Sequence, residues 1–202
     1  MIERGYKMTC GCGRHWGEIK PDVIILFSGG ADSVLLVEFA ESLNLTPFCV
    51  LIDYQQLHIQ ELEVAEKFLN ERSISYKRVK LHDLGICSGL TGDGTKDRFE
   101  GVHSMHVSSR NLMFVSIAAS IAEDRGVDTV WLGCDWDDYL NEFPDCKQEW
   151  IGRVNKVLQI NGPHPTIKLE APLLGLSKEN VLRMLRDCEV DGSQIFSGYG
   201  GL

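Results

Sequence analysis

Short apolar runs alternate with segments of helical periodicity along this chain, and that alternation constrains its fold more than any other feature. Residues 23–27 form an uninterrupted apolar run, and from Asp32 onward apolar residues recur every three or four positions. A second run at 48–52 precedes a helical pattern at about 56–70, and 75–79 indicates a third strand. Continuous apolar strands joined by helices are typical of buried parallel sheets. We therefore expect an α/β fold, a single doubly wound parallel sheet with helices on both faces.

The second half of the chain continues this pattern after an irregular stretch. Residues 85–109 are rich in Gly, Ser, Thr and Asp, and a connection this long inside a compact domain is usually functional. A helix over 110–125 is apolar nearly all round, which predicts deep burial, and Gly126 is a natural stop. The remaining elements expected are a strand at 129–132, an acidic loop at 133–145, a helix at 147–159 burying Trp150, Val154, Val157 and Leu158, a strand at 167–169, and a final helix capped by Ser177 that turns Val181, Met184, Leu185 and Cys188 inward.

Length and charge exclude several classes of protein. The 202 residues, 44% of them hydrophobic, suffice for one domain at 21–202, preceded by an extension at 1–20 that carries Cys10 and Cys12. No apolar run approaches the roughly 20 residues that a bilayer needs, and the first residues do not form an export signal. A net charge of −9 disfavours direct nucleic-acid binding, which depends on Lys and Arg. The seven cysteines are then expected to be reduced thiols of a cytoplasmic protein.

The chemistry is indicated by the turn Ser28-Gly29-Gly30-Ala31-Asp32-Ser33, where the first strand ends and a helix begins. In an open α/β sheet, ligands bind at this position. Two glycines allow the backbone to come close, and a helix N-terminus offers N–H groups to an anion. The turn is neither the Walker loop nor the dinucleotide fingerprint. From these residues alone, a phosphate-binding loop and an ordinary glycine turn both remain open.

The segment resembles the pyrophosphate loop of the N-type ATP pyrophosphatases, and other motifs narrow the resemblance to the 7-cyano-7-deazaguanine synthases. That family's Asp-Tyr-Gly-Gln-Arg-His is matched at 53–58, its Val-x-Gly-Arg-Asn at 107–111, and its aromatic-Pro-Asp-Cys at 143–146. Its Glu-x-Pro-Leu-x-x-Leu-x-Lys is echoed at 170–178. The order holds from residue 23 to about residue 188, some four-fifths of the chain.

This chain departs from the family at several positions. Gln55 and Ser109 stand where the family has Gly, and Leu57 stands where it has Arg. The four zinc-binding cysteines that the family carries near its C-terminus have no counterpart at 196–202. Cys10, Cys12 and His15 are three candidate ligands where zinc prefers four, so zinc binding remains open.

The resemblance implies an AMP-forming, ATP-dependent ligase. Such an enzyme adenylates the carboxylate of 7-carboxy-7-deazaguanine and uses ammonia to form first an amide and then the nitrile, 7-cyano-7-deazaguanine. It also implies ATP and Mg²⁺ as cofactors and small molecules as substrates. We expect a homo-oligomer whose product feeds tRNA or DNA modification. Three alternatives remain: an enzyme that stops at 7-amido-7-deazaguanine, one that joins an adenylated acid to another amine, and a degenerate module that only binds a nucleotide or a partner.

Residue roles follow from the same resemblance. Ser28, Gly29, Gly30 and Ser33 are expected to hold pyrophosphate, and Asp32 either caps the helix or orders Mg²⁺. Lys178 is expected to reach the phosphates as a point charge, and Arg110 to pair with a phosphate or the substrate carboxylate. The other candidate substrate contacts are Asn111, Asp138, Asp145 and His58, whereas Asp135 and Asp137 are expected to be solvated and Cys146 to be a small buried residue of the site.

Overall fold

The computed structural model describes residues 20–56, 60–81, 109–140, 143–161 and 167–196. The strands within these ranges lie in one five-stranded sheet, in the order β3-β2-β1-β4-β5, and every neighbouring pair is parallel. The strands are β1 (Val23–Leu26), β2 (Pro47–Asp53), β3 (Ser75–Lys80), β4 (Thr129–Trp131) and β5 (Lys168–Glu170). The helices are α1 (Ala31–Ser42), α2 (Gln60–Glu71), α3 (Arg110–Arg125), α4 (Trp136–Leu140), α5 (Gln148–Asn161) and α6 (Lys178–Asp187), with short 3₁₀ turns η1 (Pro144–Cys146) and η2 (Gly192–Gln194).

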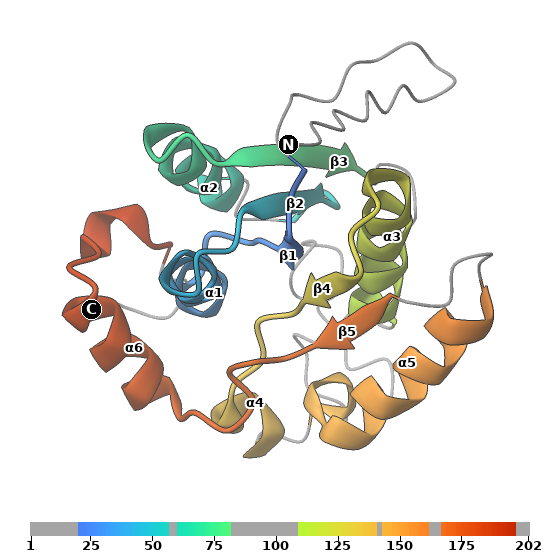
Figure 1. Ribbon diagram of the computed structural model, residues 1–202. Helices are drawn as coiled ribbons and strands as arrows, with labels where there is room; N and C mark the ends of the chain where they lie inside the picture. The colour runs from blue at the N-terminus through green and yellow to red at the C-terminus, as the bar shows by residue number, and fades with distance from the viewer. Residues whose placement is uncertain (1–19, 57–59, 82–108, 141–142, 162–166, 197–202) are drawn as a thin grey trace, which may run out of the picture.

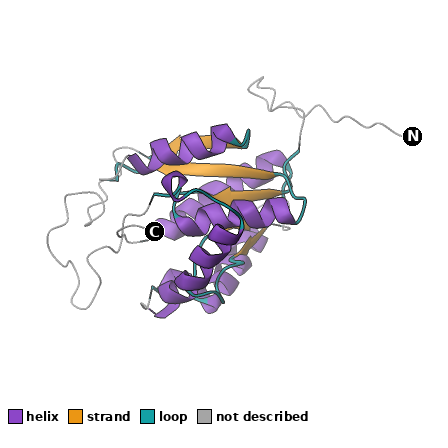
Figure 2. Cartoon of the chain, turned by 90° about the vertical axis from the view of Figure 1, so that its left-hand side faces the viewer, coloured by secondary structure: helices purple, strands orange, loops and turns teal. Residues whose placement is uncertain are grey.

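Helices cover both faces of this sheet, as predicted (Figure 1 and Figure 2). Alternate residues of β1 point to opposite faces: Ile25 belongs to a core cluster with residues of α1, α2 and α6, and Ile24 belongs to a second cluster with residues of α3 and α5. Both side chains are fully buried, which explains why the strand is apolar without alternation. The predicted α/β doubly wound fold is confirmed.

The strand order places a switch point at β1. The chain winds outward from β1 to β2 and β3, and then returns to pair β4 with the other edge of β1, with Ile24 opposite both Phe48 and Val130. The connections on the two sides of β1 therefore diverge, which leaves a crevice at the carboxyl ends of β1 and β4. Ligands bind in such crevices.

Several local predictions were wrong. The segment predicted as an acidic loop contains α4 and η1. The helix α3 is not buried all round, because Leu112 is 42% exposed, and on α5 Val157 is 53% exposed. Cys188, predicted to face inward, is exposed. Each helix covers the sheet with one stripe only, so apolar residues outside that stripe remain at the surface. Within the described ranges, no helix combines the length and the apolar character needed to cross a bilayer.

Candidate active site

A cavity of about 360 Å³ occupies the crevice at the carboxyl ends of β1, β2 and β4. Each of these strands contributes residues to its wall where the strand ends, and the N-terminal turns of α1 and α3 complete it. Seven of the predicted site residues line this cavity: Ser28, Asp32, Ser33, Arg110, Asn111, Asp138 and Asp145. The fold thus brings together residues that are more than a hundred positions apart in the sequence.

The hydroxyl of Ser33 organises the turn between β1 and α1. Its Oγ accepts hydrogen bonds from the backbone N–H groups of Gly29 (3.1 Å) and Ser28 (3.3 Å), and donates to the carbonyl of Gly30 (2.9 Å). Gly29 has a φ of +83°, and a Cβ there would lie 3.0 Å from the Cβ of Ala65 on α2. Only glycine fits this close approach, so the turn is held in one shape.

Asp32 and Lys178 form the charged centre of the site. The Lys178 Nζ lies 2.5 Å from Oδ2 of Asp32 and 3.2 Å from Oδ2 of Asp135. Burial raises the pKa of Asp32 to about 6, and Lys178 offsets part of that rise. Burial by itself lowers the pKa of Lys178, but Asp32 and then Asp135 hold that pKa above its ordinary value. An ammonium paired in this way stays charged and fixed in position beside the turn.

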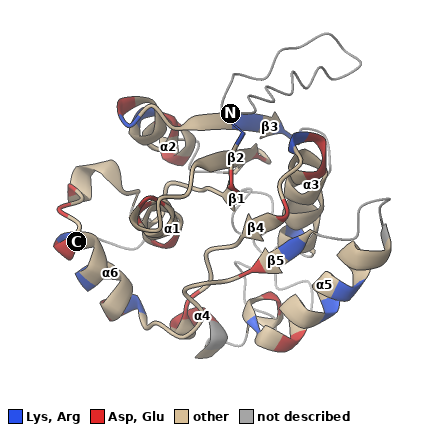
Figure 3. Cartoon of the chain, viewed as in Figure 1, with Lys and Arg blue, Asp and Glu red and all other residues tan. Residues whose placement is uncertain are grey.

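The structure corrects three predictions around this pair. Gly30 is the N-cap of α1, so Asp32 does not cap the helix. Asp135 is 1% exposed rather than solvated, and its backbone and carboxylate exchange hydrogen bonds with Asp138. Asp137 accepts a hydrogen bond from the backbone N–H of Lys178. The chain entering α6 runs alongside α4 (Figures 1 and 3), and the backbone N–H of Trp136 donates to the backbone carbonyl of Leu176 (2.8 Å). This segment covers the acidic side chains, so they are not fully solvated.

An aromatic and cationic wall lies on the opposite side of the cavity. The Tyr54 ring lies 5.3 Å from the Phe114 ring and 6.0 Å from the Arg110 guanidinium carbon. No carboxylate of the described residues pairs with Arg110. A guanidinium at the start of α3 can therefore bind an anion that enters the cavity. Asn111, which follows it, is 9% exposed.

The third wall carries thiols and carboxylates. Cys134 follows β4, Cys146 ends η1, and both are buried free thiols, as predicted for Cys146. Contact with the Cys146 thiol, followed by burial, raises the pKa of Cys134 well above its ordinary value. Burial and the nearby Asp135 also raise the pKa of Asp138. Among the described residues, the Asp145 side chain makes no hydrogen bond or ion pair, which leaves it available to a ligand.

Both family glycines that this chain replaces sit in left-handed backbone. Gln55 has a φ of 62° and Ser109 a φ of 56°. Such a conformation costs an L-residue roughly 1 kcal/mol or more relative to glycine. The two residues flank the cavity, after β2 and before α3, so the chain retains strained turns where its ligand-facing residues begin.

Sequence reasoning missed several cavity residues. Tyr54, Gln56 and Cys134 follow the ends of β2 and β4, as Ser28 follows β1, and that shared position could have identified them. No comparable signal marks Asp135, because an acidic segment without periodicity is indistinguishable from a solvated loop. His58 and the Cys10, Cys12 and His15 cluster lie outside the described residues.

The residues present fit the Mg²⁺ that the sequence resemblance led us to expect. The Oδ1 atom of Asp32 is buried without a hydrogen-bond partner, although a buried carboxylate oxygen normally has one. Carboxylate oxygens are the ligands that Mg²⁺ prefers, usually one or two of them together with phosphates. Asp32 is therefore the residue that would hold the ion beside the turn.

Two solved structures share the architecture. The U34-tRNA thiolase NcsA from Methanococcus maripaludis superimposes with a TM-score of 0.58 at 17% identity, over 89% of this chain and 60% of that one. An NH₃-dependent NAD synthetase from Campylobacter jejuni gives 0.55 at 16% identity, over 91% of this chain and 71% of that one. At this identity the likeness concerns the fold alone. The fold is that of the adenine-nucleotide alpha hydrolase-like proteins.

Sequence comparison identifies the family within this fold. The profile of the family described as "Queuosine biosynthesis protein QueC" matches residues 22–202, so this chain belongs to the QueC family. The 7-cyano-7-deazaguanine synthase of Prochlorococcus marinus (strain MIT 9312) is 31% identical over 89% of this chain and 84% of its own length. The 7-cyano-7-deazaguanine synthase of Myxococcus xanthus (strain DK1622) is 32% identical over 79% of this chain and 75% of its own length.

Proposed function

We propose that this chain is an AMP-forming ligase that converts 7-carboxy-7-deazaguanine and ammonia to 7-cyano-7-deazaguanine with ATP. The observation that carries the proposal is the placement of the Ser28–Ser33 turn in the same cavity as Arg110 and Asp145. ATP requires a turn that binds its phosphates. 7-carboxy-7-deazaguanine requires a cation for its carboxylate and an acceptor for its ring N–H groups. Membership of the QueC family supports this assignment.

The chain's own residues would divide the work as follows. A carboxylate oxygen is a poor leaving group, whereas AMP is a good one, so the site must stabilise pyrophosphate as it departs. The turn at the N-terminus of α1 would bind it with the hydroxyls of Ser28 and Ser33 and with the N–H groups of Gly29 and Gly30, which would exchange their present bonds to Ser33 Oγ (3.1 Å) and Ser28 Oγ (3.3 Å) for bonds to the anion. Lys178 adds a fixed positive charge behind Asp32. When bound, Mg²⁺ neutralises phosphate charge, and Asp32 would hold it.

The acyl half of the substrate would lie across the cavity. Arg110 can hold the carboxylate in a planar, two-point contact. Asp145 can accept hydrogen bonds from adjacent N–H groups on a guanine-like edge, because a carboxylate is a double acceptor. Asp138 stays a candidate for the same edge, although Asp135 already donates to it (3.3 Å). Asn111 and His58 also stay candidate substrate contacts.

One incubation tests the proposal against its alternatives. The full chain is supplied with ATP, Mg²⁺, ammonium and 7-carboxy-7-deazaguanine, while AMP, ADP and the product mass are followed. AMP together with the nitrile supports the proposal. An amide as end product would indicate the shorter reaction, and no AMP with any acid would indicate a binding module. Formation of ADP instead of AMP would overturn the assignment.

The matched control uses two serines of helix α1. Ser33→Ala removes the hydroxyl that organises the turn, whereas Ser42→Ala removes one that bonds only the Phe39 carbonyl (2.7 Å) at the exposed far end of the helix. Slower AMP formation at limiting ATP in the first variant, and an unchanged rate in the second, would support a reaction at the turn. The expected homo-oligomer, the cytoplasmic location and the lack of direct nucleic-acid contact stay predictions.

A further inference from the structure

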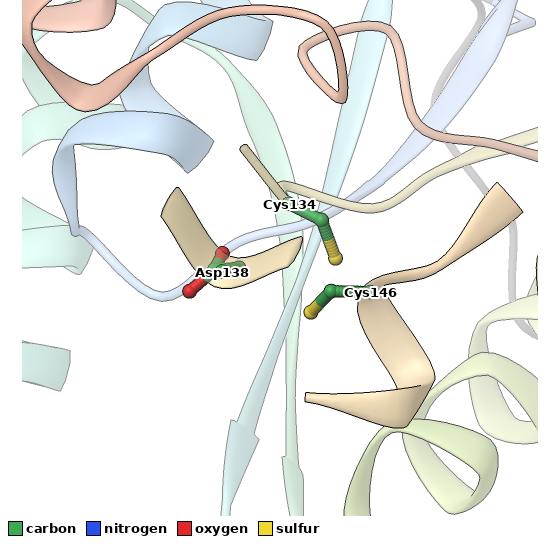
Figure 4. A group of neighbouring side chains, drawn as sticks. All are labelled: Cys134, Asp138 and Cys146. Atoms are coloured by element: carbon green, nitrogen blue, oxygen red, sulfur yellow. The ribbon is translucent and has the colours of Figure 1, made fainter. Parts of the chain in front are cut away.

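Three side chains on one wall of the cavity form a cluster that the proposed ligase reaction does not use together. One ligand atom each from Cys134, Asp138 and Cys146 lies within 4.8 Å of the other two. Figure 4 shows the Cys134 thiol pointing toward Cys146, with Asp138 alongside on α4. The thiols are 1% and 6% exposed. Two buried thiols beside a carboxylate, open to a cavity, are a set of groups that metal ions bind.

We propose that Cys134, Asp138 and Cys146 hold one thiophilic divalent cation, and that Zn²⁺ is the ion this donor set fits. Zinc binds thiolate sulfur at about 2.3 Å and carboxylate oxygen at about 2.0–2.2 Å in a tetrahedron, which puts two thiolates roughly 3.8 Å apart. The cluster is already close to that spacing. Closing it around an ion needs side-chain movement of about 1 Å or less.

The elements around the cluster position each of the three ligands. Cys134 is buried in the four-residue segment that joins β4 to α4. Asp138 is oriented by paired hydrogen bonds: its N–H donates to Asp135 Oδ1 (3.0 Å), and its Oδ2 accepts from the N–H of Asp135 (3.3 Å). Cys146 ends η1, where Pro144 occupies the first turn and the Cys146 N–H donates to the Phe143 carbonyl (3.1 Å). Ligands fixed in this way are typical of built metal sites.

The charge around the cluster favours a cation. Three carboxylates gather here: Asp135 and Asp138 exchange hydrogen bonds, and Lys178 bridges Asp135 to Asp32. A site with excess negative charge and low exposure concentrates cations. The type of ligand atom then determines which ion binds at each site. The carboxylate oxygen of Asp32 suits Mg²⁺, whereas the sulfurs of Cys134 and Cys146 suit Zn²⁺.

Three protein ligands leave one tetrahedral position open. All three residues line the cavity, so that position faces the space where a substrate would lie. Three ligands and an open position characterise zinc sites that bind substrate, whereas structural zinc sites are closed by four. The ligand class expected at the fourth position is a small oxygen or nitrogen donor, such as water, ammonia or a carboxylate oxygen.

The experiment measures metal directly, so that its outcome does not depend on the ligase reaction. The full chain is purified under reducing conditions without chelators, and the zinc content per chain is determined by elemental analysis and native mass spectrometry. Cys134→Ser and Cys146→Ser are compared with Cys188→Ser, which removes an exposed thiol outside the cluster. A Cys10→Ser, Cys12→Ser double variant separates any zinc held at 1–20.

The cluster variants are expected to lose one equivalent of zinc per chain, and Cys188→Ser none. In Co²⁺-substituted protein, the thiolate-to-metal charge-transfer absorption should weaken in both cluster variants and persist in the Cys10/Cys12 variant. Asp138→Asn keeps both thiols and is expected to weaken zinc binding at least about tenfold in chelator competition. This variant tests the site even if the serine variants misfold. Thermal unfolding shows separately whether the serine variants are folded.

Unchanged zinc content in folded Cys134→Ser and Cys146→Ser would overturn the proposal. So would a wild-type chain that takes up no Zn²⁺ or Co²⁺, or one in which the two cysteines are joined as a disulfide and metal is excluded. AMP formation is recorded on the same samples. A chain that forms AMP without metal at these cysteines contradicts the zinc site and leaves the ligase proposal intact.

Discussion

Replacing Asp32 by Asn is expected to make the folded chain more stable while stopping its turnover. The Asp32 side chain is only 20% exposed, and burial raises its pKa from 3.8 to about 6. The folded chain therefore binds this proton more tightly than the unfolded chain does. Stability from this group is fully present below about pH 3.8 and is lost as the pH rises through about 6. At neutral pH the ionised carboxylate destabilises the fold.

The magnitude follows from the same rise in pKa. Each pH unit corresponds to about 1.4 kcal/mol, so ionised Asp32 costs about 3 kcal/mol of unfolding free energy at pH 7.5 as an upper estimate. Asn has nearly the shape of the neutral carboxyl, and Lys178 keeps its contact with Asp135 (3.2 Å). We expect Asp32→Asn to gain about 1–3 kcal/mol at pH 7.5 and almost nothing near pH 4.

Urea unfolding of both chains between pH 4 and pH 8 measures this difference. Asp124→Asn, on the exposed side of α3, is the control and should change stability by less than about 0.5 kcal/mol. Mg²⁺ with pyrophosphate should then stabilise the wild type more than Asp32→Asn, because the variant lacks the anionic ligand. A variant that is no more stable than the wild type at pH 7.5 would refute this account of a carboxylate kept ionised for a ligand.

Further substitutions test other parts of the site. Gly29→Ala should lower the free energy of unfolding by more than about 1 kcal/mol in thermal or urea denaturation, because of its φ of +83° and the 3.0 Å approach to Ala65; unchanged stability would contradict the predicted close packing. Gln55→Gly should raise it by about 1 kcal/mol by relieving left-handed strain, and a loss of stability would show that Gln55 makes compensating contacts. Ser33→Ala should raise the KM for ATP roughly tenfold in an AMP assay, against unchanged values for Ser42→Ala. Asp53→Asn should cost about 2 kcal/mol in urea unfolding, because Arg78 loses its 2.8 Å charged partner; an equal loss in an Arg78→Met background would contradict that coupling.

Periodicity alone predicted the sheet, because buried parallel strands must be continuously apolar whatever else surrounds them. It also located the turn at 28–33, because two glycines between a strand and a helix indicate a tight turn at that point. The resemblance supplied Arg110, Asp138, Asp145 and Lys178, and the fold brought the first three into the cavity, while Lys178 contacts Asp32. These features depend on local residue order, which a sequence displays directly.

Tertiary structure alone decided the pairing of charges and thiols. Lys178 and Asp32 are 146 positions apart, and only the return of β4 to the edge of β1 brings α6 to the start of α1. The same return buries Asp135 and sets Cys134 against Cys146. Proximity across a sheet depends on strand order and on which face each helix covers. The local sequence pattern contains neither kind of information. It therefore could not show that the acidic segment, which resembled a solvated loop, forms one wall of the site.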